Sequence, residues 1–438
     1  MTLESSGLMR ILHTSDLHLG ATLEQASLED EQSRFLEWLF LTLQEDRVEC
    51  LIIAGDVFDT GQAPARAQGL YYRFLQRCSG LPALRKIVVV GGNHDSASQL
   101  DAPAPVLQSI AVQVVGGLSS DPAGWDRALI PITDTKGHTE AVIVATPYIH
   151  ESRLGVGRIA GEGVDSEHTR TFFQAFEDFY TELARRALAS YGQVPLVGVA
   201  HLTCLPAAQK LRDDDFKTDL HQVGALGALP PSIFCEDYAY VALGHIHRSF
   251  AVERGRVWYS GTPVPIRFGE ARTPRQVLLV DIGEEVVVTP RRVPEFRALL
   301  ELQDTPEELE RLVGTRTWES PLPPYLSIES RVEITRPGTL DRLRERINEQ
   351  FTPEERPRII AFREVLTGDS EVSEFGEART IDLDTLTPDR LFTRLYRSQN
   401  QGQAPPPEIQ QAFASLLPRD DAPLELPMEN AQPSLEDI

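Results

Sequence analysis

Short apolar runs alternate with longer amphipathic stretches along the first two thirds of the chain. The apolar runs are typical of buried strands, and they cover residues 10–12, 51–54, 87–90, 196–199 and 240–243. Three segments carry apolar residues at helical spacing, and these are residues 33–43, 65–78 and 171–189. Alternating strands and helices predict an α/β layered domain. The aromatic residues of these helices are expected in the core, with a homodimer face as the alternative for the 65–78 helix.

The pattern changes near residue 286. Strands are predicted at 297–302, 325–334 and 357–365, and helices at 306–312 and 338–351. Together they indicate a compact α+β unit, interpreted as a capping domain on the substrate side. The predicted boundaries are therefore 9–285 for the first domain and 286–370 for the cap.

The C-terminal part has a third character. Residues 385–417 contain two short amphipathic helices, around 391–396 and 409–417. Their apolar faces can dock on the parent domain or bind a partner. Residues 418–438 are acidic and rich in proline, and we expect them to be disordered.

Composition narrows the class of protein. A chain of 438 residues is expected to form two or three domains. The net charge is −23, from 42 basic and 65 acidic residues. Nucleic-acid binders usually carry a basic surface, so any DNA contact should be local, metal-assisted or shared with a partner. The alternative is that the acidity only keeps the protein soluble.

Other sequence features favour a cytoplasmic protein. The four cysteines are scattered, which argues against a disulfide scaffold or a zinc knuckle and favours a reducing compartment. No apolar stretch is long enough to span a membrane. The first eight residues lack the pattern of a signal peptide, and Met9 is an alternative start to Met1.

A polar cluster follows each of the five apolar runs of the first domain. The clusters are Asp16-Leu17-His18, Gly55-Asp56-Val57-Phe58-Asp59, Gly92-Asn93-His94-Asp95, Ala200-His201-Leu202-Thr203 and Gly244-His245-Ile246-His247. Residues at the ends of successive strands can converge at one edge of a sheet. Carboxylate, imidazole and amide oxygen without thiolate suit hard or borderline cations such as Mn²⁺ better than structural zinc. Two such ions that share a carboxylate form a recurring site for phosphate-ester hydrolysis.

These motifs, in this order, resemble the calcineurin-like metallophosphoesterase superfamily and, within it, the SbcD family of bacterial nuclease subunits. The likeness extends to the sequence segments that flank the proposed ligands. It spans about residues 9–285, with a weaker likeness to about residue 417. It implies an α/β fold with a two-sheet core flanked by helices, a small α+β cap and a helical tail.

The resemblance also implies the role of each motif residue. The first metal would be held by Asp16, His18 and His247, and Asp56 would bridge the two metals. A carboxylate suits the bridge because it offers two oxygens and negative charge between two cations.

The second metal would be held by Asn93, His201 and His245. His94 is not assigned to a metal, and would lie beside the scissile phosphate to support the transition state or protonate the leaving oxygen.

Four further residues near the motifs are open to more than one interpretation. Asp59 is expected either to support the ligands from behind or to cap a turn. Asp95 is expected to accept hydrogen bonds that fix its loop, and His13 to be packed inside a strand. Arg248 could contact a phosphate or form a surface ion pair.

By this resemblance, the chain would be an Mn²⁺-dependent DNA nuclease subunit, with Mg²⁺ as the alternative metal. It would act as an ATP-gated 3′→5′ exonuclease on double-stranded DNA and as an endonuclease on single strands and hairpins. These activities serve DNA replication, recombination and repair at the bacterial nucleoid. Since the chain has no glycine-rich phosphate loop, nucleotide would be bound by the partner, an SMC-like SbcC ATPase. SbcC would contact residues 385–417, and the chain would form a homodimer within a heterotetramer.

Two rival functions remain at this stage. A dimetal phosphoesterase acting on nucleotides or other non-DNA phosphoesters would use the same ligands. A catalytically inactive scaffold that only binds SbcC and DNA is the other rival, and the complete ligand set argues against it.

Overall fold

The computed structural model describes residues 9–150, 166–206, 228–332 and 338–366, together with single positions between 392 and 413. The chain divides into two units, residues 1–366 and residues 367–438. In the second unit Phe392, Tyr396, Ile409 and Phe413 are helical, at positions where helices are expected, and the rings of Phe392 and Phe413 stack at 4.0 Å. Most of the predicted segment 385–417 and the whole tail 418–438 lie outside the described residues.

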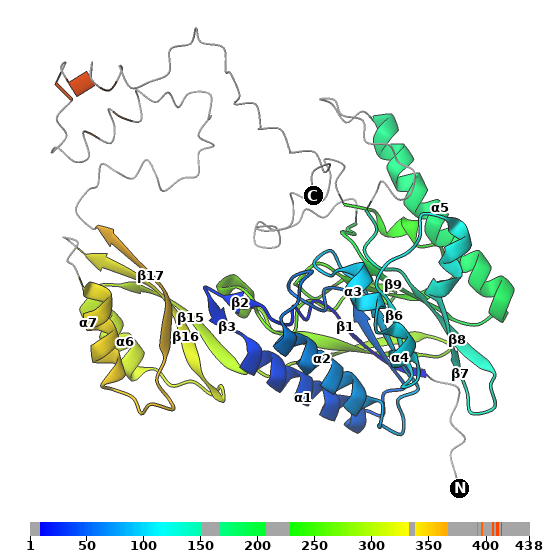
Figure 1. Ribbon diagram of the computed structural model, residues 1–438, viewed down its shortest axis with the longest axis horizontal. Helices are drawn as coiled ribbons and strands as arrows, with labels where there is room; N and C mark the ends of the chain where they lie inside the picture. The colour runs from blue at the N-terminus through cyan, green and yellow to red at the C-terminus, as the bar shows by residue number, and fades with distance from the viewer. Residues whose placement is uncertain are drawn as a thin grey trace, which may run out of the picture. The chain divides into compact units, whose positions relative to one another are not determined.

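Two six-stranded sheets form the centre of the first unit (Figure 1). The first sheet has the order β14-β13-β1-β4-β5-β6, with β1 (Met9–Thr14), β4 (Cys50–Ala54), β5 (Lys86–Val90), β6 (Val112–Val115), β13 (Gln276–Ile282) and β14 (Val286–Arg292). The second has the order β11-β12-β10-β9-β8-β7, with β7 (Leu129–Thr133), β8 (Thr139–Ala145), β9 (Leu196–His201), β10 (Tyr238–Gly244), β11 (Phe250–Glu253) and β12 (Val257–Tyr259). The five predicted strands are β1, β4, β5, β9 and β10. Within each sheet these strands run parallel to their neighbours among the five.

Side-chain alternation along the strands builds two hydrophobic layers. Ile52 and Val88 belong to the layer that joins the two sheets, whereas Ile53 and Val89 face helices α1 (Glu29–Glu45) and α2 (Ala65–Cys78). Such strands are buried on both faces, which explains their continuous apolar runs. The second sheet is packed by α5 (Ser166–Tyr191). The predicted α/β fold with two sheets and flanking helices is confirmed.

The helices predicted at 33–43, 65–78 and 171–189 are also confirmed, although α1 starts earlier than its apolar spacing indicated. Glu29, Asp30 and Glu31 form its first turn. Acidic side chains stabilise a helix N-terminus, and this signal is independent of apolar periodicity. No described helix has both the length and the apolar character of a membrane span.

The predicted elements of the cap are all present. A three-stranded parallel sheet contains β15 (Arg297–Asp304), β16 (Leu322–Val332) and β17 (Arg358–Leu366), and its helices are α6 (Pro306–Thr315) and α7 (Thr339–Asn348). Leu326 and Ile328 pack with both helices, while Tyr325 points to the opposite side of the sheet. β14 extends the first central sheet to Arg292, so this sheet continues beyond residue 285. The domain boundaries themselves remain a prediction.

A buried ion pair joins the cap to the central domain. Arg297 at the start of β15 forms a salt bridge with Glu31 of α1, and their side chains are only 5% and 4% exposed. The Arg297 guanidinium also lies 4.0 Å from the ring centroid of Tyr325. The Tyr325 hydroxyl donates to the carbonyl of Ser27 at 3.2 Å. Tyr325 packs against Leu23 as part of the apolar junction, so polar and apolar contacts act together here.

Removal of one partner of this pair should be strongly destabilising. We expect Arg297→Met to lower the free energy of unfolding by about 3–5 kcal/mol, because Glu31 would keep a buried charge without compensation. Urea unfolding of the full chain measures this value. The double variant Arg297→Met with Glu31→Leu should recover most of the loss. A single variant within about 1 kcal/mol of wild type would contradict this account.

Candidate metal centre

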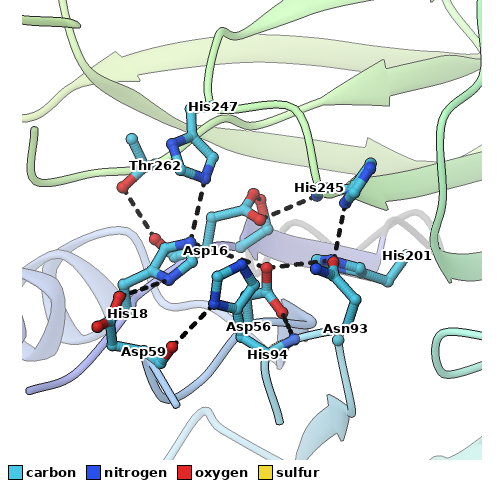
Figure 2. A network of polar contacts seen from close by, with 12 residues as sticks. Asp16, His18, Asp56, Asp59, Asn93, His94, His201, His245, His247 and Thr262 are labelled. Atoms are coloured by element: carbon cyan, nitrogen blue, oxygen red, sulfur yellow. Dashed lines mark hydrogen bonds and ion pairs between the residues drawn. The ribbon is translucent and has the colours of Figure 1, made fainter. Parts of the chain in front are cut away.

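The predicted ligands converge on one point at the carboxyl ends of the central strands (Figure 2). The first sheet contributes residues after β1, β4 and β5, and the second contributes the end of β9 and the loop after β10. These side chains are Asp16, His18, Asp56, Asn93, His201, His245 and His247. The structure therefore brings together all seven residues that the motifs predicted.

One half of the centre is built by Asp16, His18 and His247. Their ligand atoms all lie within 4.8 Å of one another. The Nε2 atoms of His18 and His247 are 3.1 Å apart. Two ligands of one six-coordinate cation lie about 3 Å apart when each bond is about 2.1 Å, so this spacing fits a shared cation.

The other half is built around the side-chain oxygen of Asn93. This oxygen lies 2.9 Å from Nε2 of His201 and 2.9 Å from Nδ1 of His245. Oδ2 of Asp56 lies 3.3 Å from Nε2 of His201 and 3.7 Å from Nε2 of His18. Asp56 therefore lies between the two halves, where a bridging carboxylate is needed.

Burial makes the charges of this centre strongly interdependent. The side chains of Asp56 and His201 are 3% and 0% exposed. Burial opposes protonation of His201, but the charge and hydrogen bond of Asp56, the charge of Asp16 and the carbonyl of Ala54 together outweigh it and raise the pKa of His201 to about 9. Burial also disfavours the charged form of Asp56, yet the charge and hydrogen bond of His201 hold its pKa well below the ordinary value. Asp56 is therefore in the ionised form that a carboxylate needs to bind a cation.

Several of these residues have an unusual backbone conformation. Asp16, His18, Asp56 and His245 have φ values of 53°, 43°, 48° and 99°. Each positive φ costs a non-glycine residue roughly 1–3 kcal/mol, and such strain concentrates at functional sites. The backbone N–H of His245 donates to Oδ1 of Asp16 at 2.9 Å, so the strained loops of the two sheets hold each other in place.

Asp95 fixes the loops around Asp56. Its carboxylate accepts the backbone N–H groups of Val57, Phe58 and Gly92 at 3.0, 2.9 and 2.9 Å. Burial, together with the nearby charge of Asp56, raises the pKa of Asp95 to about 6. The prediction that Asp95 is a loop-fixing acceptor is confirmed.

His94 contacts the carboxylate of Asp56 through its backbone, and its ring is held on one side by Asp59. Its backbone N–H donates to Oδ1 of Asp56 at 2.9 Å, and its Nδ1 is 2.8 Å from the carbonyl oxygen of Asp59. A carbonyl only accepts, so Nδ1 of His94 carries the proton in this contact. Oδ1 of Asp59 lies 3.4 Å from Nδ1 of His18, which favours its role in supporting the ligands over turn capping.

The structure also describes His13 and Arg248. His13 is fully buried, with Nδ1 2.9 Å from the Tyr240 hydroxyl and Nε2 3.2 Å from the Leu243 carbonyl, so its packed position is confirmed. The guanidinium of Arg248 lies over the ring of Phe250, 4.7 Å from its centroid, and a contact of Arg248 with a phosphate, or a surface ion pair, stays a prediction.

Sequence reasoning missed Glu270, whose carboxylate lies 2.8 Å from Nδ1 of His247. Glu270 belongs to η5 (Phe268–Arg272), a short 3₁₀ helix without periodic apolar residues. Nothing in its local pattern marks it. The only available signal was its position a few residues beyond the family-like segment 259–265.

Comparison with known proteins agrees with this geometry. The family model for calcineurin-like phosphoesterases matches residues 9–147. A curated relative from Rhodobacter capsulatus, named as the SbcD component of the nuclease SbcCD, is 36% identical over 74% of this chain and 76% of its own length. The chain belongs to the SbcD nuclease family. It is accordingly a metal-dependent phosphodiesterase of α/β fold.

Two further relatives carry the same name. The protein from Escherichia coli K12 is 33% identical over 62% of this chain and 64% of its own length. The protein from Bacillus subtilis 168 is 27% identical over 93% of this chain and 97% of its own length. The likeness therefore includes the region beyond the central sheets.

Gly92 provides a test of the crowding around Asp56. A Cβ at this position would overlap Oδ1 and the backbone nitrogen of Asp56. We expect Gly92→Ala to weaken Mn²⁺ binding about 10- to 100-fold, as measured by isothermal titration calorimetry.

Gly80→Ala is the matched control, because the nearest atom to its added Cβ is the Arg77 carbonyl at an ordinary 3.5 Å. It should bind Mn²⁺ as wild type does. Unchanged affinity in Gly92→Ala would show that Asp56 does not bind the metal.

Proposed function

We propose that this protein is an Mn²⁺-dependent DNA nuclease that works with an SbcC-type ATPase. The observation that carries the proposal is the convergence of seven oxygen and nitrogen donors from five strand ends, with Asp56 between the two halves. Thiolate is absent from this set, which favours Mn²⁺, with Mg²⁺ as the alternative, over structural zinc.

Each half of the centre is proposed to hold one metal ion. The first ion is held by Asp16, His18 and His247, and the donor spacings there support this assignment. The second ion is held by Asn93, His201 and His245, again supported by short spacings between their atoms. Asp56, which lies between the two groups, would bridge the ions. When bound, the ions would activate a water and neutralise charge on the phosphoryl oxygens.

His94 is proposed to act on the substrate itself. The bond from its Nδ1–H to the Asp59 carbonyl fixes the ring and its tautomer. Nε2, once protonated, can donate to the leaving oxygen as the P–O bond breaks. The backbone N–H of His94 also donates to Asp56. This bond would keep the proposed general acid, His94, at a fixed position relative to the proposed bridging ligand, Asp56.

The partners follow from the family and from the charge. The relatives are components of SbcCD nucleases, so we expect this chain to bind an SbcC-type ATPase through residues 385–417. A net charge of −23 is unusual for a protein that binds DNA on its own, and SbcC would supply much of the basic surface. ATP turnover by SbcC would then gate access of DNA ends and hairpins to the site.

The remaining features of the proposal concern assembly and biology. Two copies of the chain would join two of SbcC in a heterotetramer. The activities would be 3′→5′ exonuclease on double strands and endonuclease on single strands and hairpins, in replication, recombination and repair. With such a substrate the complex would act at the cytoplasmic nucleoid.

His94→Ala tests this function. With SbcC, ATP and Mn²⁺, wild type should cut a labelled DNA hairpin, and His94→Ala should cut about 10²- to 10⁴-fold more slowly while it still binds Mn²⁺. His138→Ala is the matched control, since that histidine is 76% exposed and pairs with Asp134 far along the chain from every ligand. Hydrolysis of a small phosphodiester without any DNA cleavage by wild type would favour the non-DNA phosphoesterase instead.

A further inference from the structure

A carboxylate outside the predicted ligand set holds His247 from behind. Glu270 is 11% exposed, and its Oε1 lies 2.8 Å from Nδ1 of His247. Its Oε2 accepts the backbone N–H of Ile266 at 2.9 Å. Because both oxygens are engaged, the carboxylate has a fixed place, and Nδ1 of His247 must donate to it. Nε2 is thereby directed to the metal centre, where it lies 3.1 Å from Nε2 of His18.

Arg275 fixes the two backbone segments that carry this pair. One terminal nitrogen of its guanidinium donates to the His247 carbonyl at 2.7 Å, and the other donates to the Glu270 carbonyl. Its Nε donates to the Thr273 carbonyl at 3.2 Å. The planar fork of an arginine can reach two carbonyls at once, which the single ammonium of a lysine cannot do in the same geometry.

His247 needs such support because of where it lies. It follows β10 by three residues, in a loop without strand register, whereas His201 ends a central strand. The carbonyl of His247 also accepts the N–H of Thr262 at 3.1 Å. Without the Glu270 and Arg275 contacts, little else in the described structure fixes the tautomer of its ring.

We propose that Glu270 and Arg275 are positioning residues, which form a clamp that holds His247 so that its Nε2 can bind the first metal. The proposal rests on the proposed metal site. When one ring nitrogen of a histidine binds a metal, a carboxylate that accepts a hydrogen bond from the other ring nitrogen commonly sets the tautomer of that histidine and raises its basicity. The clamp lies in the segment that also contacts the cap, since Arg272 pairs with Glu301 at 2.7 Å.

Titration calorimetry of the full chain with Mn²⁺ tests the clamp without using activity. Glu270→Gln removes the negative charge at nearly constant size. We expect the affinity for one of the two ions to fall about 10- to 100-fold while the other ion binds as in wild type. Arg275→Lys should cause the same selective loss. With Co²⁺ as the probe, the visible absorption of the same ion should change in both variants.

Arg272→Ala is the matched control, because it removes a cation from the same segment without touching the clamp. It should bind both ions with wild-type affinity. If the Glu270→Gln and Arg275→Lys variants also bind both ions with wild-type affinity, the clamp is overturned and the metal site still stands. Equal loss of both ions, together with loss of near-ultraviolet circular dichroism, would show a structural role and would equally overturn it. A wild-type chain that binds no Mn²⁺ would overturn the metal site itself.

Discussion

The buried negative charge of Asp56 is the constraint on which the rest of the centre depends. A carboxylate that is 3% exposed cannot remain ionised unless opposite charge or hydrogen-bond donors surround it. Imidazoles from both sheets and the N–H of His94 provide this surrounding. The loops that hold it have strained backbone, and they require Gly92, whose position leaves no room for a side chain. A centre in which carboxylates and imidazoles lie this close together is best stabilised by bound cations.

The two-sheet framework explains why this arrangement can be rigid. Strands buried on both faces have little freedom, and their carboxyl ends deliver ligands from segments nearly 200 residues apart along the chain (Asp56 from one sheet and His245 from the other). The cap is joined to the same framework through the buried Arg297–Glu31 pair. The cap contacts η5 through the Arg272–Glu301 pair, and η5 also carries Glu270, the residue that holds His247. The cap and the metal centre are therefore connected through η5.

Local sequence patterns predicted much of this molecule, and the exceptions have physical reasons. The runs at 51–54 and 87–90 predicted buried strands correctly because burial on two faces leaves a continuous apolar signal. The motif residues could be placed because each directly follows such a run. Glu270 and Arg275 could not be found this way, since they lie in an irregular segment and act through contacts with a distant loop. The Arg297–Glu31 pair joins residues 266 positions apart, and no local pattern encodes it.

The central claim is that these seven residues bind two ions, one on each side of Asp56. Anomalous X-ray diffraction at the manganese absorption edge, from crystals grown with Mn²⁺, tests it most directly. The account predicts two anomalous peaks about 3.5–4 Å apart, one beside His18 and His247 and one beside Asn93, His201 and His245. A single peak, or peaks away from Asp56, would contradict it.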